Sequence, residues 1–120
     1  MALKFIKGRL KGMKYSFQGG IHLLKTEASI QVQFGIFVLV TIAGFFFKIS
    51  NYEWIAQFLC VGLVMTAEGL NTAIEGVADF IHPDYHEKIG RIKDVAAGAV
   101  GIAALVSVIV AGIIYLPKIF

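Results

Sequence analysis

The sequence predicts an all-α integral membrane protein, with an N-terminal amphipathic helix on the membrane surface and three transmembrane helices. Of the 120 residues, 58% are hydrophobic and only 16% are charged, whereas an ordinary soluble domain has about 25% charged residues. Three long apolar segments follow one another, and basic residues gather at the start of the chain. The length suits a single domain that covers residues 1–120.

Residues 1–27 are expected to form the surface helix. They combine six basic residues with apolar residues at roughly helical spacing, which is typical of helices that lie on an anionic membrane surface. Gly19 and Gly20 mark a place where this helix could break. A flexible basic arm is the alternative.

The three apolar segments are expected to cross the bilayer at residues 28–48, 54–81 and 95–117. Each is long enough for a hydrocarbon core of about 30 Å, which needs about 20 helical residues. Residues 82–94 are expected to form a charged loop between the last two spans. Because cytoplasmic loops are enriched in Lys and Arg, we expect the N-terminus and this loop on the cytoplasmic side.

Four polar residues lie near the end of the second apolar segment: Glu68, Asn71, Glu75 and Asp79. On a helix that advances about 100° per residue, these four residues and Thr72 share a face roughly 100° wide. Counting about 20 residues from Trp54 places the membrane boundary close to residue 73, so Glu68 lies within the apolar zone. An ionised carboxylate there costs at least about 2.5 kcal/mol. Glu68 is therefore predicted to be functional rather than only a link between helices.

A stripe of glycines accompanies this polar face. Gly62, Gly69 and Gly76 recur every seven residues. Small residues at such spacing let another helix approach closely, so we expect a helix to pack along the stripe.

The charged groups near the boundary fit phosphoryl transfer. Carboxylates at a membrane surface suit Mg²⁺, which takes oxygen ligands and often bridges to phosphates, and Glu27 approaches the same surface from the first span. Lys88, Arg91 and Lys93 offer positive charge for phosphate oxygens. The sequence contains no G-x-x-x-x-G-K-[ST] loop and no protein-kinase signature set. Any ATP site must therefore be of another type.

A zinc site is an alternative interpretation of the spacing H-x-x-x-H-E at His82, His86 and Glu87. Pro83 directly follows His82, which argues against one regular helix carrying both histidines. We therefore interpret these residues as part of an ordinary solvated loop.

The stretches EGLNTAIEGVADF and DYHEKIGRIKDVAAGAV resemble the small bacterial membrane kinases that include diacylglycerol kinase and undecaprenol kinase. The resemblance extends from KYSFQGG, at Lys14, through the third span. It implies a homotrimer in the bacterial inner membrane, with active sites between protomers on the cytoplasmic side. It also implies transfer of the γ-phosphate of MgATP to the hydroxyl of a membrane lipid, for lipid carrier or phospholipid recycling. No nucleic-acid partner is expected.

The resemblance assigns roles to residues at matching positions. Glu68 matches the general base beside the lipid hydroxyl, and Glu27 and Glu75 match the Mg²⁺ ligands that hold ATP. Asn71 and Asp79 are expected to orient Glu68 and to order the site. Further nucleotide contacts are implied at Tyr15, Asp84, Tyr85, His86, Lys93 and Asp94.

Two departures from the family pattern concern Arg9 and Ala97. An arginine expected near position 8 is here Gly8 followed by Arg9. Ala97 stands where the diacylglycerol-kinase branch tends to carry serine, which favours undecaprenol over diacylglycerol as the acceptor.

Two other classes of function remain open from the residues alone. A small ion or proton carrier could use Glu68 as its intramembrane titratable group, although a carrier has no need of the charged pairs in the loop. A purely structural oligomeric protein is the other alternative.

Overall fold

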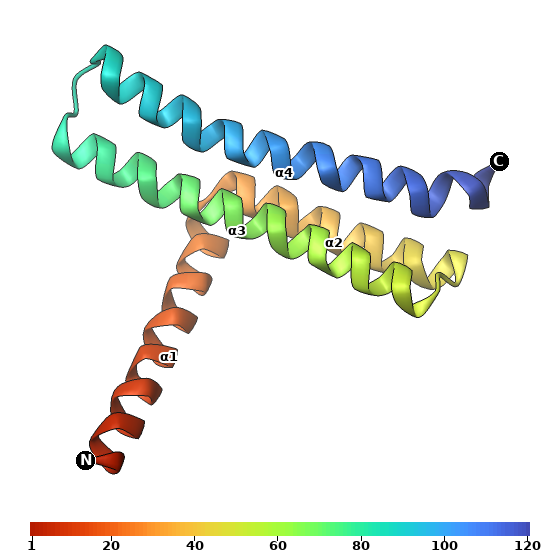
Figure 1. Cartoon of the computed structure of the whole chain (residues 1–120), viewed down its shortest axis with the longest axis horizontal. Coiled ribbons are helices and arrows are strands. Elements are labelled where there is room, and N and C mark those ends of the chain that lie inside the picture. The colour runs from red at the N-terminus through yellow and green to blue at the C-terminus, as the bar shows by residue number, and fades with distance from the viewer.

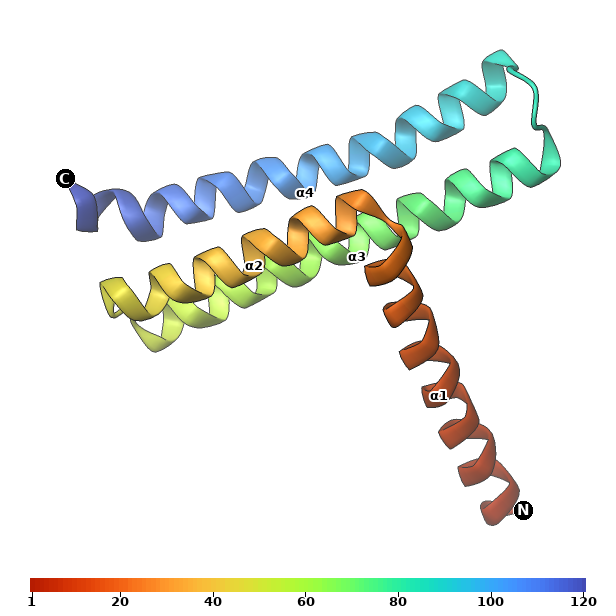
Figure 2. The ribbon, with the colours of Figure 1, turned by 180° about the vertical axis from the view of Figure 1, so that it is seen from behind.

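The computed structural model describes residues 1–120 as four helices without strands (Figure 1). The bounds are α1 Ala2–Thr26, α2 Ala28–Phe47, α3 Asn51–Ile81 and α4 Glu87–Ile119. α2, α3 and α4 lie side by side as an antiparallel bundle, and α1 leaves the bundle at a steep angle (Figures 1 and 2). We call the end with residues 82–86 the loop end, and the end with residues 48–50 and the C-terminus the terminal end.

Three of the helices, α2, α3 and α4, are long and apolar enough to cross a membrane. Only 9 of the 120 residues are buried within the chain, and most large apolar side chains face outward. Such a surface suits hydrocarbon, because monomeric proteins in water rarely expose large apolar patches. The prediction of an all-α membrane protein is confirmed.

The helix limits differ from the predicted ones at the start of α3. The helix begins at Asn51 rather than at residue 54, because Ser50 and Glu53 form a capping box. The backbone N–H of Glu53 donates to the Ser50 hydroxyl at 3.2 Å, and the Ser50 N–H donates to the Glu53 carboxylate at 2.9 Å. Two otherwise unpaired backbone donors are thereby satisfied.

The loop between α3 and α4 is shorter than the predicted range of residues 82–94. α4 begins at Glu87, where the Nδ1 of His86 accepts a hydrogen bond of 3.0 Å from the Lys88 N–H. Glu87 and Arg91 lie one turn apart, with 3.8 Å between their charged groups. The polar residues 87–94 thus extend the helix beyond its apolar part.

α1 runs through Gly19 and Gly20 without a break. Only Glu27 separates it from α2, with an extended backbone of φ −102° and ψ 113°. The Gln31 amide donates to the carbonyls of Leu24 and Lys25 at 3.1 and 3.2 Å. Because the last carbonyls of a helix lack partners within it, Gln31 fixes the junction between α1 and α2.

The terminal end of the bundle is held by polar contacts among three helices. Gln57 is 6% exposed, and its amide donates to the Val40 carbonyl at 3.0 Å. The Tyr115 hydroxyl donates to the other end of the Gln57 side chain at 2.5 Å. Lys118 pairs with Glu53 at 2.7 Å. These contacts join α2, α3 and α4 where the surrounding side chains are apolar.

α3 and α4 extend past the start of α2 toward the loop end (Figure 1). α1 meets α3 at Gly69, where an added Cβ would lie 3.2 Å from the Leu23 side chain. A Cβ at Gly62 or Gly76 would meet nothing within 4 Å. The glycine stripe is therefore contacted at one position within this chain, not along its whole length as expected.

Candidate active site

The polar face of α3 contains the predicted residues in helical register. The Asn71 amide donates to the Glu75 carboxylate at 3.2 Å, one turn further along the helix. The Oδ1 of Asn71 is buried and has no hydrogen-bond partner. Glu68 is half-buried and makes no hydrogen bond within the chain. An acid and an amide acceptor on this face are thus both available to a bound group.

Asp79 connects α3 to α4 through Lys93. The Lys93 Nζ lies 2.5 Å from an Asp79 carboxylate oxygen. The two side chains are 36% and 56% exposed, so their pairing contributes at most about 1 kcal/mol to stability. Lys93 can therefore exchange Asp79 for another anion at little cost.

The loop at residues 82–86 is ordered by its histidines. The Nδ1–H of His82 donates to the Asp84 carbonyl at 2.6 Å, while the Nδ1 of His86 accepts from the backbone. The two rings are 5.3 Å apart in an edge-to-face arrangement. The chain contains no group of three or more His, Cys, Asp and Glu side chains that could hold a metal ion.

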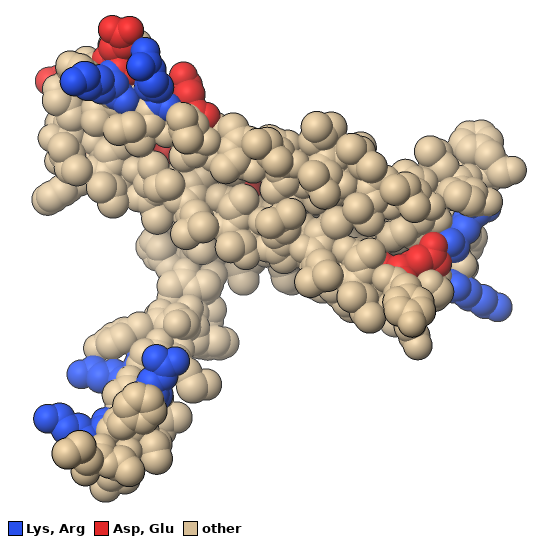
Figure 3. Space-filling view, in the orientation of Figure 1, with Lys and Arg blue, Asp and Glu red and all other residues tan.

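Acidic and basic side chains gather at the loop end, where they come from α3, the loop and the start of α4 (Figure 3). Further basic side chains line α1. Tyr85 in the loop is 86% exposed and rests against Gly90, where an added Cβ would lie 3.2 Å from its ring. Charged and aromatic groups thus face the solvent beside the polar face of α3.

The structure brings together some of the predicted site residues and separates others. Asn71 contacts Glu75, and Asp79 contacts Lys93; neither makes a hydrogen bond to Glu68. Within the single chain two residues lie apart from the loop end: Glu27 at the junction of α1 and α2, and exposed Tyr15 on α1. The loop and the adjoining start of α4 contain the others: Asp84, Tyr85, His86, Lys93 and Asp94.

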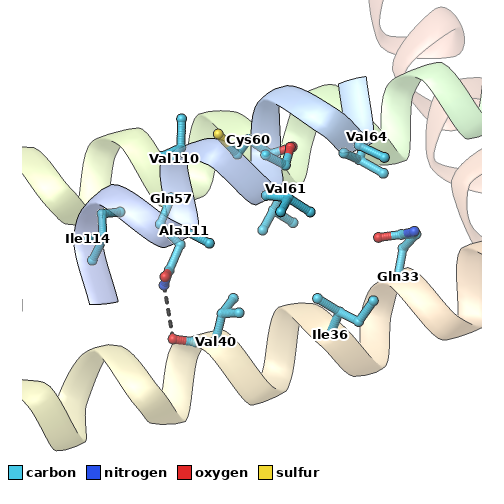
Figure 4. A pocket seen from close by; sticks show the side chains of 13 residues that line it. Gln33, Ile36, Val40, Gln57, Cys60, Val61, Val64, Val110, Ala111 and Ile114 are labelled. Atoms are coloured by element: carbon cyan, nitrogen blue, oxygen red, sulfur yellow. Dashed lines mark hydrogen bonds between the residues drawn. The ribbon is translucent and has the colours of Figure 1, made fainter. Parts of the chain in front are cut away.

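Two further polar residues were not recognised from the sequence. Gln31 fixes the junction beside Glu27, and Gln57 forms the polar contacts at the terminal end (Figure 4). Each is an amide within an otherwise apolar segment. That position was the available signal, because a polar side chain in hydrocarbon seeks a hydrogen-bond partner.

Comparison with known proteins gives consistent matches along most of the chain. The model of the family described as prokaryotic diacylglycerol kinase matches residues 14–115. Undecaprenol kinase of Bacillus subtilis (strain 168) is 36% identical over 108 residues, which cover 90% of this chain and 88% of that protein. Diacylglycerol kinase of Escherichia coli (strain K12) is 34% identical over 100 residues, which cover 83% and 82%. Diacylglycerol kinase of Synechocystis is 34% identical over 109 residues, which cover 90% and 62%.

Proposed function

This chain belongs to the prokaryotic diacylglycerol kinase family, and on that premise we propose that it transfers the γ-phosphate of ATP to the hydroxyl of undecaprenol or diacylglycerol. The family, a group of membrane lipid kinases, favours this reaction over the ion-carrier alternative. The observation that carries the proposal is the polar face of α3, which presents a half-buried acid, Glu68, on a helix long and apolar enough to cross a membrane. The reaction serves recycling of a lipid carrier or of phospholipid.

Glu68 acts as the general base in this proposal. It lies one residue before Gly69, where α1 meets α3, and α1 has the composition of a surface helix. On the count of residues from Trp54, the carboxylate then lies a short way inside the boundary between headgroups and hydrocarbon, at a depth that a lipid hydroxyl can reach. Because Glu68 makes no hydrogen bond within the chain, its carboxylate is available to accept the proton of the lipid hydroxyl during transfer.

Glu27 and Glu75 provide the Mg²⁺ ligands. Mg²⁺ is usually held by one or two carboxylates together with substrate phosphates, so two glutamates fit it without a larger protein cluster. Asn71 holds one oxygen of Glu75 by a hydrogen bond and leaves the other open. When bound with ATP, Mg²⁺ neutralises charge on the phosphates.

Lys93 stabilises charge on the transferring phosphoryl group. In the single chain its ammonium group pairs with Asp79 in an exposed position, and phosphate oxygens are stronger competitors for it. The loop residues Asp84, Tyr85 and His86, the adjoining Asp94, and Tyr15 on α1 make the remaining nucleotide contacts.

Three copies of the chain form a homotrimer in the bacterial inner membrane, with the N-terminus and the loop end in the cytoplasm. The exposed apolar surface of α2, α3 and α4 supports further helix contacts. Because Tyr15 and the loop lie apart within one chain, a neighbouring copy is required to bring such groups to one site. Sedimentation of the detergent-solubilised protein tests the trimer.

The acceptor lipid is undecaprenol in preference to diacylglycerol, on the strength of Ala97. The identities of 36% and 34% to relatives of the two names do not separate them. A side-by-side assay of phosphate transfer to the two lipids decides this point. Equal rates would contradict the Ala97 argument.

Paired glutamine variants test the reaction. Glu68→Gln is expected to slow phosphate transfer by about 10²–10⁴-fold with ATP binding kept, because a general base contributes that much. Glu75→Gln is expected to weaken MgATP binding itself. Transfer is measured with labelled ATP, and binding by titration of the nucleotide. Glu53→Gln, at the terminal end, is the matched control and should transfer normally; normal transfer in Glu68→Gln would exclude Glu68 as the base.

A further inference from the structure

A histidine stands at each end of the loop that joins α3 to α4 (Figure 1). His82 is the C-cap residue of α3, and its backbone N–H donates to the Ala78 carbonyl at 2.9 Å. His86 is the N-cap residue of α4. The nucleotide contacts proposed above include His86, but they leave His82 without a role.

Hydrogen bonds to the backbone fix the tautomer of each imidazole ring. The Nδ1 of His82 lies 2.6 Å from the Asp84 carbonyl oxygen, which can only accept, so this nitrogen carries a proton. The Nδ1 of His86 lies 3.0 Å from the Lys88 backbone nitrogen, whose N–H can only donate, so this nitrogen carries none. A neutral imidazole has one N–H and one acceptor nitrogen. The Nε2 of His82 is therefore an acceptor, and the Nε2 of His86 is a donor.

Both Nε2 atoms are free to contact a ligand. Neither makes a hydrogen bond within the chain. His86 is exposed. The only buried side-chain polar atom without a partner is the Oδ1 of Asn71, so the Nε2 of the half-buried His82 is accessible as well. The ring centres are 5.3 Å apart, and one ligand can therefore meet an acceptor and a donor on adjacent rings.

We propose that His82 and His86 select the adenine base of the nucleotide. The N6 amino group of adenine donates to the Nε2 of His82, and N7 of adenine accepts from the Nε2–H of His86. The inference rests on the proposed function, and it adds His82 as a residue that determines specificity for the base. Adenine presents a donor at N6 and an acceptor at N7 on one edge, whereas guanine presents two acceptors, O6 and N7.

The two histidines contribute differently to this selection. N7 is present in both purines, so the donor of His86 strengthens the binding of ATP and of GTP alike. The O6 of guanine would face the acceptor nitrogen of His82, and two acceptors without a proton between them repel each other. His82 is therefore the residue that separates the two purines.

Asparagine is the informative substitution at both positions, because its short side chain retains the contact with the backbone. Asparagine is a favourable N-cap residue, so His86→Asn keeps an acceptor for the Lys88 N–H. The amide of asparagine can also donate, so His82→Asn keeps a donor for the Asp84 carbonyl. Each variant thus removes the Nε2 that would contact the base, while the hydrogen bond that orders the loop remains.

Phosphate transfer from altered nucleotides tests each contact separately. The full-length protein, in vesicles with a lipid alcohol, is given ATP, GTP, 7-deaza-ATP, which lacks N7, or purine riboside triphosphate, which lacks the N6 amino group. Assays at about pH 8 keep imidazole rings neutral. In the wild type, kcat/KM should be about tenfold higher for ATP than for each of the others, which corresponds to one net hydrogen bond.

The variants should remove these preferences one at a time. His86→Asn should use ATP and 7-deaza-ATP equally well and still prefer ATP to GTP. His82→Asn should lose the preference for ATP over GTP and over purine riboside triphosphate, and still prefer ATP to 7-deaza-ATP. Equal use of all the nucleotides by the wild type overturns the inference and leaves the proposed function standing. A loss in both variants that is the same for every nucleotide indicates a purely structural role and also overturns it.

Nitrogen NMR of isotopically labelled histidine rings gives a readout that is independent of turnover. Without nucleotide, the wild type should show the proton of His82 on Nδ1 and that of His86 on Nε2, and the two asparagine variants assign the signals. The reverse tautomer at either ring overturns the inference. Absence of transfer from every nucleotide overturns the proposed function instead; titration with ATP and with GTP then decides the inference, which requires tighter binding of ATP.

Discussion

The hydrogen bond of Asn71 shows how far the contacts of a single residue could be predicted from the sequence. The sequence placed Asn71 on the same helix face as Glu68 and Glu75, and that register is correct. Residues three and four positions apart are both neighbours on a helix, so spacing alone could not choose between the two glutamates. The structure pairs Asn71 with Glu75, which makes it a support for the proposed metal ligand. The proposed catalytic roles themselves stay predictions.

Asp79 gives a test at the same scale. Asp79→Asn removes the charge that positions Lys93 before ATP binds, so phosphate transfer should slow by at least a few fold. Because the pair is exposed, the free energy of unfolding should change by less than about 1 kcal/mol. Transfer assays and denaturation in detergent measure the two quantities. Glu87→Gln breaks another exposed pair, with Arg91, and should have little effect; unchanged transfer in Asp79→Asn would show that Lys93 needs no such partner.

A substitution at Gly44 tests the packing between α2 and α3. An added Cβ there would lie 2.5 Å from the Trp54 ring, so Gly44→Ala should lower the free energy of unfolding by about 1–3 kcal/mol. Gly35→Ala is the control on the same helix, because a Cβ at Gly35 meets nothing within 4 Å. That variant should be neutral or stabilising, since alanine favours helix. Thermal unfolding in detergent compares them, and equal stability of the two variants would contradict the contact.

For the helices, the apolar segments could be predicted from the sequence, but the residues at which the helices begin could not. A long apolar segment indicates a span, but a helix continues as far as its backbone groups are satisfied. α3 begins earlier than predicted because of Ser50 and Glu53, and α4 begins earlier because of His86. The sequence contains the capping pattern S-x-x-E, but it lies at residues 50–53, between the predicted spans 28–48 and 54–81. The charged stretch at residues 87–94 was likewise taken for loop.

The capping box supplies a prediction at this scale. Ser50→Ala removes the acceptor for the Glu53 N–H and should cost about 1 kcal/mol of stability. Ser29→Ala, in the first turn of α2, removes a hydroxyl that makes no hydrogen bond in the chain and serves as the control. Unfolding of both variants in detergent measures the difference. A loss no larger than that of Ser29→Ala would show that the cap does not hold α3.

For the whole molecule, the sequence predicted one domain with three spans, and it also predicted which ends share a side. It could not predict how α1 is oriented, because that depends on Glu27 and Gln31 at one junction. Nor could it show the contacts among Gln57, Val40 and Tyr115, because these residues meet only after the helices pack. The spacing of apolar residues along the sequence predicts helices, but it does not predict which residues of different helices come into contact.

A prediction for the whole molecule concerns its orientation in the membrane. Tyr85, in the loop, and Tyr52, at the start of α3, are both 86% exposed at opposite ends of the bundle. With Cys60→Ser as background, Tyr85→Cys should react with an impermeant thiol reagent only from the cytoplasmic side, and Tyr52→Cys only from the other. Labelling in intact cells and in inverted vesicles distinguishes the sides. Labelling of both positions from one side would contradict three spans.

The single extended residue between α1 and α2 has a mechanical consequence. α1 can act as a lever arm, because it joins the bundle through Glu27, the hydrogen bonds of Gln31 and the contact of Leu23 with Gly69. A change in the tilt of α1 against the bundle would therefore act on Glu27, the residue proposed to hold the metal. The orientation of α1 and the geometry of the proposed nucleotide site thus depend on the same residue.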